Sequence, residues 1–276
     1  MIPARVTSTL LLLLVVPVAW PQEAKVRASL ADAGDAWVGQ RVTLVVELLA
    51  PGYFASAAHF SIPDPAGVLL MPPQSHPLVG RETIDGVAYT VQRHELPAWP
   101  MRAGSQALPA VTVDFRYKRN PLDKETVTAS VTTAAIELPV AMPPGAENLG
   151  TVISAHELEM TESWDPVPGK ADVPAGSAFT RTVTFTAPDV PGMVFPPFPA
   201  GDLDGLGVYS KQHVEDREDR GTLTGMRRDV ITYVVQEPGQ YEIPAASLTW
   251  FDLDARTLRT ISLPPRMLNV VINPAM

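Results

Sequence analysis

The sequence contains no cysteine, and this absence excludes several kinds of chemistry. Disulfide bonds, thiolate metal sites and cysteine nucleophiles all need a residue that the chain lacks. A domain without disulfides must be stabilised by its own apolar core. The chain has 276 residues, which is enough for two domains of ordinary size.

Helical patterning and basic charge are also scarce. No stretch combines an apolar period near 3.6 with helix caps, and 29 prolines are too many for a helical protein. Prolines and charges interrupt every later apolar run before it is long enough to span a membrane. The net charge of −9 argues against nucleic acids and anionic membrane surfaces as partners. The composition instead favours short strands joined by rigid turns.

The first residues have the layout of a secretory signal. Arg5 is the single charge of a short leading region, residues 10–16 form an unbroken apolar run, and Ala19 ends a stretch of small residues. We predict a signal peptide over residues 1–24, cleaved between Ala19 and Ala24. A retained anchor is the alternative. Either way, the chain is expected in the periplasm or cell envelope.

An internal repeat is the most informative feature. Gly39 and Gly176 each open a run in which apolar and polar residues alternate, as they do on a half-buried strand. When the two runs are laid over each other, apolar residues coincide: Val42 with Phe179, Val46 with Val183 and Leu48 with Phe185.

A second pair of landmarks confirms the spacing of the repeat. Residues 104–110 match residues 239–245, and the two glycines of a copy are 65 residues apart in the first copy and 63 in the second. Short alternating strands at this spacing are typical of sandwiches. The sequence therefore predicts an all-β protein of two tandem immunoglobulin-like β-sandwich domains, residues 25–142 and 153–273, joined by a semi-rigid linker at 143–152.

In the second copy we expect strands at residues 179–186, 208–213, 227–236, 241–250 and 259–271. The charged run 215–221 is expected to be a turn between two of them. Pro244 cannot donate to a ladder, so its strand should start at a sheet edge or pair only after the proline.

Arg181 departs from the repeat. Its position places a charge on the apolar face, where the first copy has Leu44, and a buried charge needs a partner. One interpretation is a strand-end arginine paired with a carboxylate such as Asp252 or Asp254. The other is recognition of a partner protein.

Other candidate partner-binding residues are aromatic or acidic. Trp99 lies in a predicted turn, and Phe195 and Phe198 lie in a proline-rich stretch; such aromatics either anchor an interface or cap the ends of the sandwiches. The acidic candidates lie in the charged run, which is either a solvated hairpin tip or a docking loop for a basic partner: Glu215, Asp216, Glu218 and Asp219.

No catalytic, cofactor-binding or metal-binding residues are predicted. The five histidines are scattered, without metal-ligand spacing, and no nucleophile elbow, zinc-binding helix or phosphate loop occurs. We therefore expect a non-enzymatic protein without a cofactor.

The order of several motifs resembles the BatD family, also called oxygen-tolerance or aerotolerance proteins. The motifs lie at residues 38–39, 85–86, 104–109, 164–166, 176–182, 195–197, 205–209, 232–234 and 239–250. The resemblance implies a bacterial envelope protein that works with von Willebrand factor A-type proteins and a MoxR-type ATPase in aerotolerance or stress resistance. Family members usually carry a membrane helix after the last sandwich, which is not found here. Membrane association is expected only through partners or an uncleaved signal segment.

The functional expectation is an interaction or scaffold protein that presents strand edges and end loops to envelope partners. The alternative is a secreted ligand- or carbohydrate-binding module of adhesin type, which predicts a row of exposed aromatic residues on one sheet.

Overall fold

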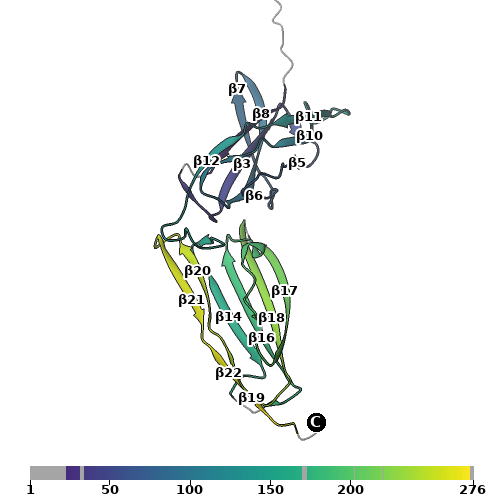
Figure 1. Cartoon of the computed structure of the whole chain (residues 1–276). Helices are drawn as coiled ribbons and strands as arrows, with labels where there is room; N and C mark the ends of the chain where they lie inside the picture. Colours follow the sequence, from purple (N-terminus) through teal and green to yellow (C-terminus); the bar gives the residue numbers. More distant parts are fainter. Residues whose placement is uncertain (1–22, 32–33, 170–172, 202, 220, 274–276) are drawn as a thin grey trace, which may run out of the picture.

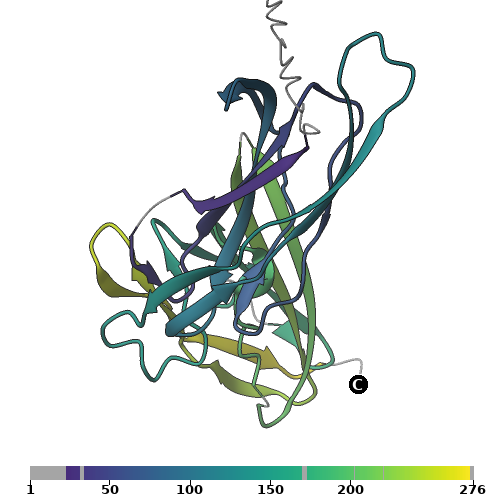
Figure 2. The same ribbon diagram turned by 90° about the horizontal axis from the view of Figure 1, so that it is seen from above.

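The structure is a computed structural model that describes residues 23–31, 34–169, 173–201, 203–219 and 221–273. Their regular structure consists of strands and one short 3₁₀ turn, η1 (Gly192–Val194). The predicted all-β class is therefore confirmed. The strands form two halves that stack end to end (Figure 1), and a view from above looks down the first half onto the second (Figure 2). Most of the predicted signal peptide lies outside the described residues.

The first half packs one long antiparallel sheet against two shorter sheets. The long sheet has the order β1 (Lys25–Leu30), β3 (Val42–Ala50), β8 (Val87–Pro100), with β6 (Val68–Leu70) and β7 (Leu78–Ile84) along the same edge of β8. The shorter sheets are β11 (Val127–Thr132), β10 (Thr112–Lys118), β4 (Tyr53–Phe54) and β5 (His59–Ser61), and β2 (Ala36–Trp37), β12 (Ile136–Ala141) and β9 (Gly104–Leu108).

The second half repeats this arrangement. Its long sheet has the order β14 (Glu159–Asp165), β16 (Ala178–Pro188), β18 (Thr222–Val235) and β17 (Leu206–Asp219). The shorter sheets are β13 (Ser154–Ala155), β20 (Ala246–Asp252) and β21 (Thr257–Leu263), and β15 (Val173–Pro174), β22 (Arg266–Val271) and β19 (Gly239–Ile243).

The repeat extends to details of pairing. In each half a two-residue strand pairs parallel with the last strand, β2 with β12 and β15 with β22. Gly39 and Gly176 both have positive φ, +77° and +90°, and both lie in the turn before the central strand, where a side chain would be strained. Each half also has its own apolar core between the long sheet and the shorter ones.

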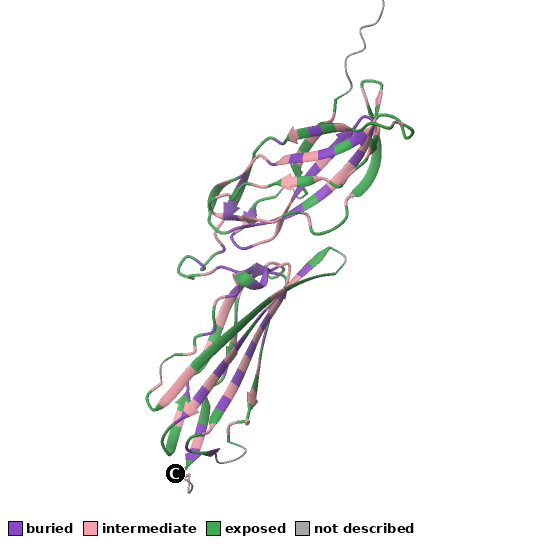
Figure 3. Cartoon of the chain, turned by 90° about the vertical axis from the view of Figure 1, so that its right-hand side faces the viewer, coloured by how far each residue is buried: buried purple, intermediate pink, exposed green. Residues whose placement is uncertain are grey.

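Alternation along the central strands explains the two cores. Burial alternates strictly along β16, and its inward side chains include Phe179, Val183 and Phe185. In the first half Leu44, Val46 and Leu48 of β3 are inward in the same way. Figure 3 shows buried and more exposed residues alternating along the long strands.

Three predicted strands were wrong in extent. The strand expected at 241–250 is divided at Pro244, because a residue without an N–H ends the pairing of β19 with β22, and β20 then pairs with β21. The strand expected at 208–213 continues as β17 to Asp219, so most of the predicted charged turn is strand. Similarly, the strand expected at 259–271 is two strands, β21 and β22.

The two halves contact each other through a packed interface, called the joint below. Ser154 Oγ donates a hydrogen bond to Val38 O at 2.6 Å, and the rings of Trp37 and Phe251 lie 5.1 Å apart. Ala146, in the predicted linker, is fully buried in an apolar cluster with residues of both halves. The linker segment is therefore part of a packed interface.

Candidate functional site

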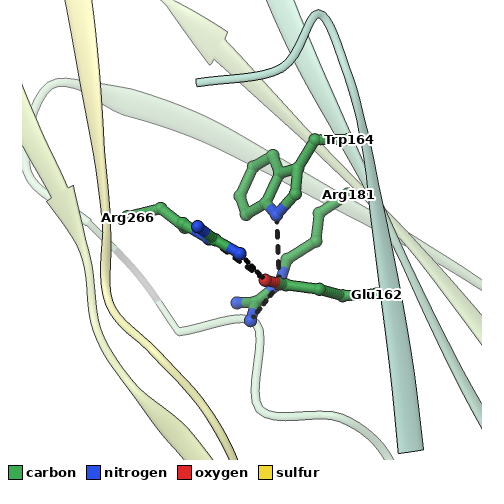
Figure 4. A network of polar contacts seen from close by, with 4 residues as sticks. All are labelled: Glu162, Trp164, Arg181 and Arg266. Atoms are coloured by element: carbon green, nitrogen blue, oxygen red, sulfur yellow. Dashed lines mark hydrogen bonds and ion pairs between the residues drawn. The ribbon is translucent and has the colours of Figure 1, made fainter. Parts of the chain in front are cut away.

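Arg181 is the fourth residue of β16 and is part of a buried polar network (Figure 4). Its Nε lies 3.0 Å from Oε2 of Glu162, which also accepts a 3.0 Å hydrogen bond from Trp164 Nε1. Arg266 Nη2 donates to the other carboxylate oxygen at 2.6 Å. The guanidinium of Arg181 also lies over the rings of Trp164 and Phe198, at 5.1 and 4.6 Å from their centroids.

This network corrects the predicted partner of Arg181. The carboxylate is Glu162, on the neighbouring strand β14, whereas Asp252 pairs with Arg259 and Asp254 with His156. Arg181 is only 1% exposed. Recognition of a partner by this side chain would require the core to open, so the folded protein does not offer it as a contact residue.

The network also sets the ionisation of its members. Burial alone would raise the pKa of Glu162, but hydrogen bonds from Arg266 and Trp164 and the charges of both arginines together hold it below its ordinary value. Burial raises the pKa of Tyr233, which lies beside Arg181. Glu162 is thus a carboxylate at neutral pH and balances the buried guanidinium.

Phe195 and Phe198 do not form an exposed anchor. They are 1% and 7% exposed, and the Phe195 ring stacks on Phe185 at 5.8 Å. Their segment, which connects β16 to β17, lies over the inner face of β18 and hydrogen-bonds to the buried pair Arg227 and Asp229. They are part of the core of the second half.

The approach of this connecting segment to β18 requires a glycine. A Cβ on Gly225 would lie 2.0 Å from Val190 O, so no side chain fits between the strand and the segment. The start of the connecting segment, residues 190–192, is therefore held close to β18 by contacts within the second half.

Trp99 is likewise buried, at 1% exposure. It lies in β8 rather than in the predicted turn, and its Nε1 donates a 2.8 Å hydrogen bond to Asp189 O of the second half. Arg41 forms an ion pair with the Asp189 side chain beside it. Trp99 therefore belongs to the joint between the halves and is not available to a partner.

The four acidic candidates lie together on the last part of β17, next to the hairpin tip. Glu215 pairs with Arg217 at 2.7 Å and with His213 at 3.6 Å, and Asp216 accepts a hydrogen bond from Gly192 N at 2.6 Å. Glu218 and Asp219 are exposed. All four residues therefore lie near the surface, and two of them, Glu215 and Asp216, are engaged in contacts within the chain.

The strand that carries them is the edge of the long sheet. β17 pairs with β18 over 14 residues, and in the described part of the chain it pairs with no other strand. Most of its side chains are exposed, including Tyr209 at 66%. Because partners exchange backbone hydrogen bonds with open edges, this is a candidate interaction site.

A groove in the first half is a second candidate, which the sequence analysis missed. It has a volume of about 760 Å³, and its lining includes Phe54, Phe60, Gln92 and His94. Burial lowers the pKa of His94 to about 4, so its imidazole is neutral at pH 7. Three histidines that are far apart in the sequence, His59, His76 and His94, line this groove, so their spacing along the chain does not indicate it.

Among the described residues, no cluster of three or more histidine or acidic side chains has the geometry to hold a metal ion. In the same part of the chain, no helix is long and apolar enough to cross a membrane.

Comparison with known proteins gave structural likenesses only. No family model and no curated protein matches the chain. The C-terminal domain of the Streptococcus agalactiae AgI/II polypeptide BspA has 8% identity and a TM-score of 0.21, over 88% of this chain and 99% of that one. The Escherichia coli adhesin FdeC has 12% identity and a TM-score of 0.18, over 90% and 64% of the two chains.

Domains 4–9 of the surface layer protein SbsC have 13% identity and a TM-score of 0.18, over 90% of this chain and 31% of that one. These neighbours include bacterial adhesin and surface-layer domains. At TM-scores this low, the likeness carries no inference about the site.

Proposed function

We propose that the protein is a non-enzymatic interaction protein of the bacterial envelope, built of two tandem immunoglobulin-like sandwiches. Its motif order resembles the BatD family, and the proposed partners are von Willebrand factor A-type proteins that act with a MoxR-type ATPase. The repeated strand order of the two halves and the export-like leading segment support this proposal.

The observation that carries the proposal is the open edge of β17. A partner strand can extend the sheet there, with backbone hydrogen bonds that provide affinity and side chains that select the partner. The opposite edge of the same sheet suits this less, because β14 has seven residues and is tied to β22 by the Glu162–Arg266 ion pair.

The exposed face of β17 adds selectivity. Gln212 accepts a hydrogen bond from Arg227 and Asp216 accepts one from Gly192 N, so these two side chains lie on the inner face of β17. Side chains alternate along a strand, so the odd-numbered residues 211–219 share the outer face. That face has charged side chains of both signs and one histidine: Lys211, His213, Glu215, Arg217 and Asp219. Like charges placed opposite one another oppose strand pairing. The row therefore selects a partner strand of matching pattern and guards the edge against unspecific association.

A cysteine-free chain allows a direct test of the edge. His213→Cys on β17 and Thr161→Cys on β14 each introduce one exposed attachment point for a photo-crosslinker. We expect the β17 variant to capture an envelope protein from membrane extracts and the β14 variant to capture none. Equal capture from both edges, or capture from β14 alone, would contradict the proposal, and mass spectrometry of the product distinguishes a foreign partner from a second copy.

A charge test sharpens this result. Glu218→Lys combined with Asp219→Lys leaves the internal bonds of Glu215 and Asp216 intact. We expect weaker capture through the labelled His213→Cys position, by about tenfold if the partner strand presents basic groups there. Unchanged capture would show that the acidic end of β17 does not contact the partner, and it would not contradict strand addition at β17.

An adhesin-like ligand-binding function is the second candidate. The groove of the first half favours it, because its ring-lined, concave surface is of the size that ligand sites have. Binding of oligosaccharides to the purified chain, measured on a glycan array, tests this candidate.

A further inference from the structure

The floor of the groove is formed by two side chains of β8. Gln92 and His94 face the inside of the sandwich, and Oε1 of Gln92 lies 3.3 Å from Nε2 of His94. The walls come from the segment 54–60 and from residues 72, 73 and 75–77. The Phe60 ring and the His94 imidazole pack edge to face, with 4.9 Å between their centroids.

The second half has a polar pair at the same place. Leu48 and Val46 of β3 are opposite Gln92 and His94, and the repeat-equivalent residues of β16, Phe185 and Val183, are opposite Arg227 and Asp229. The pair Arg227–Asp229 is also bonded internally, at 2.9 Å. Gln92 and His94 are therefore the uncharged equivalents of Arg227 and Asp229.

In the second half, the chain itself covers this pair. Phe198 N donates a 2.7 Å hydrogen bond to the Asp229 carboxylate, and Phe195 O accepts one from Arg227 at 3.4 Å. The covering stretch is extended, uncharged and rich in proline and phenylalanine, with the sequence VFPPFPA over residues 194–200. Its backbone meets the polar pair while its rings enter the core.

In the first half, the equivalent connection takes another path. After β3 it runs as β4 and β5, which pair with β10 on the opposite sheet, and Ala55 N bonds to Arg116 O. Next to β8, the segment 71–77 departs from the sheet between β6 and β7, where β17 is continuous in the second half. The groove lies in the space between these two diverging segments.

We propose that this groove binds an extended, uncharged polypeptide segment that contains proline and phenylalanine, in the manner in which residues 194–200 cover the second half. The described lining contains no Asp, Glu, Lys or Arg, which suits an uncharged occupant. A carboxamide and an imidazole can each donate and accept, so they can bond to both backbone N–H and C=O groups. Proline-rich segments bind aromatic-lined grooves at low entropic cost because they are already extended. The binding is separate from strand addition at β17.

The test uses a capped synthetic peptide of sequence VFPPFPA and the full chain. Calorimetry should show saturable binding, and Ala57→Arg, which places bulk on an exposed groove wall, should weaken it by about tenfold or more. Ala107→Arg, at an exposed position of β9 outside the groove, is the matched control and should leave affinity unchanged. Circular dichroism and thermal melting confirm that both variants fold.

Two peptide variants define the chemistry. Replacement of both phenylalanines by aspartate should abolish binding, and a scrambled peptide of the same composition should bind more weakly. The proposal is overturned if the capped peptide does not bind, if Ala57→Arg and Ala107→Arg bind it equally, or if an oligosaccharide displaces it from the groove. Because His213→Cys crosslinking reports on β17 alone, failure here leaves the result of that experiment unaffected.

Discussion

The two halves of the molecule place different chemistry at equivalent positions. In the first half, Leu30 lies opposite Leu44, and Ala28 lies opposite Val46. In the second half, Trp164 lies opposite Arg181, and Glu162 lies opposite Val183. The two halves share one strand order, but at these positions the first half has a wholly apolar cluster and the second half has a buried ion pair.

The difference shows that the fold tolerates a buried charge only when its neighbours change with it. Arg181 is accompanied by a carboxylate, by two aromatic rings and by a second arginine that binds the other oxygen of the Glu162 carboxylate. A single change in either half should therefore be more damaging than a coordinated change.

The largest expected effect comes from moving the charge into the first half. Leu44→Arg places a guanidinium where the neighbouring strand offers Leu30 and Ala28, so the charge has no carboxylate partner there. We expect a loss of more than about 4 kcal/mol in unfolding free energy, measured by urea denaturation. Thr43→Arg, one residue away and half exposed, is the control and should change stability by less than about 0.5 kcal/mol. A stable Leu44→Arg variant would show that the two cores are interchangeable after all.

The reverse change should have an intermediate effect. Arg181→Leu removes the buried partner of Glu162, leaves the partly exposed Arg266 as its charged partner, and removes the stacking on Trp164 and Phe198. We expect a loss of about 3 kcal/mol by the same measurement. Adding Glu162→Ala, which reproduces the Leu44 and Ala28 pair of the first half, should recover part of it. A double variant less stable than Arg181→Leu would refute the equivalence of the two clusters.

Most of the fold follows from local patterns in the sequence. The alternation after Gly39 and Gly176 predicted the two central strands and their inward faces, because burial imposes a period of two. The anomaly at Arg181 was visible for the same reason. The partner of Arg181 could not be predicted, because Glu162 lies on a neighbouring strand and the sequence does not show the register between the two strands.

The candidate sites were harder to predict, for two physical reasons. An edge strand has little buried surface, so β17 shows weak apolar alternation and its charges resemble a turn. The groove depends on where the connection after β3 runs, which is decided by pairing with β10, far away in sequence. The aromatic candidates failed because proline-rich sequence is typical of both exposed loops and buried caps.

The smallest predicted effect concerns the polar pairs of the two halves and is a pH dependence. Burial lowers the pKa of His94 from 6.5 to about 4, whereas its equivalent in the second half, Asp229, is held in an ion pair. Between about pH 4 and pH 6.5 the His94 imidazole binds a proton in the unfolded chain but not in the folded one. His94 therefore makes stability fall as the pH falls below about 6.5. From pH 7 to pH 5.5 its share should be about 1 kcal/mol.

Urea denaturation at both pH values measures this loss, and the difference between wild type and His94→Gln isolates the contribution of one imidazole from that of the carboxylates. His59→Gln, at an exposed position of the same groove, is the matched control and should keep the wild-type pH dependence. If His94→Gln also kept it, the imidazole would be hydrated in solution. The first half would then present its polar pair to water, whereas the second half buries its own pair beneath Phe195 and Phe198.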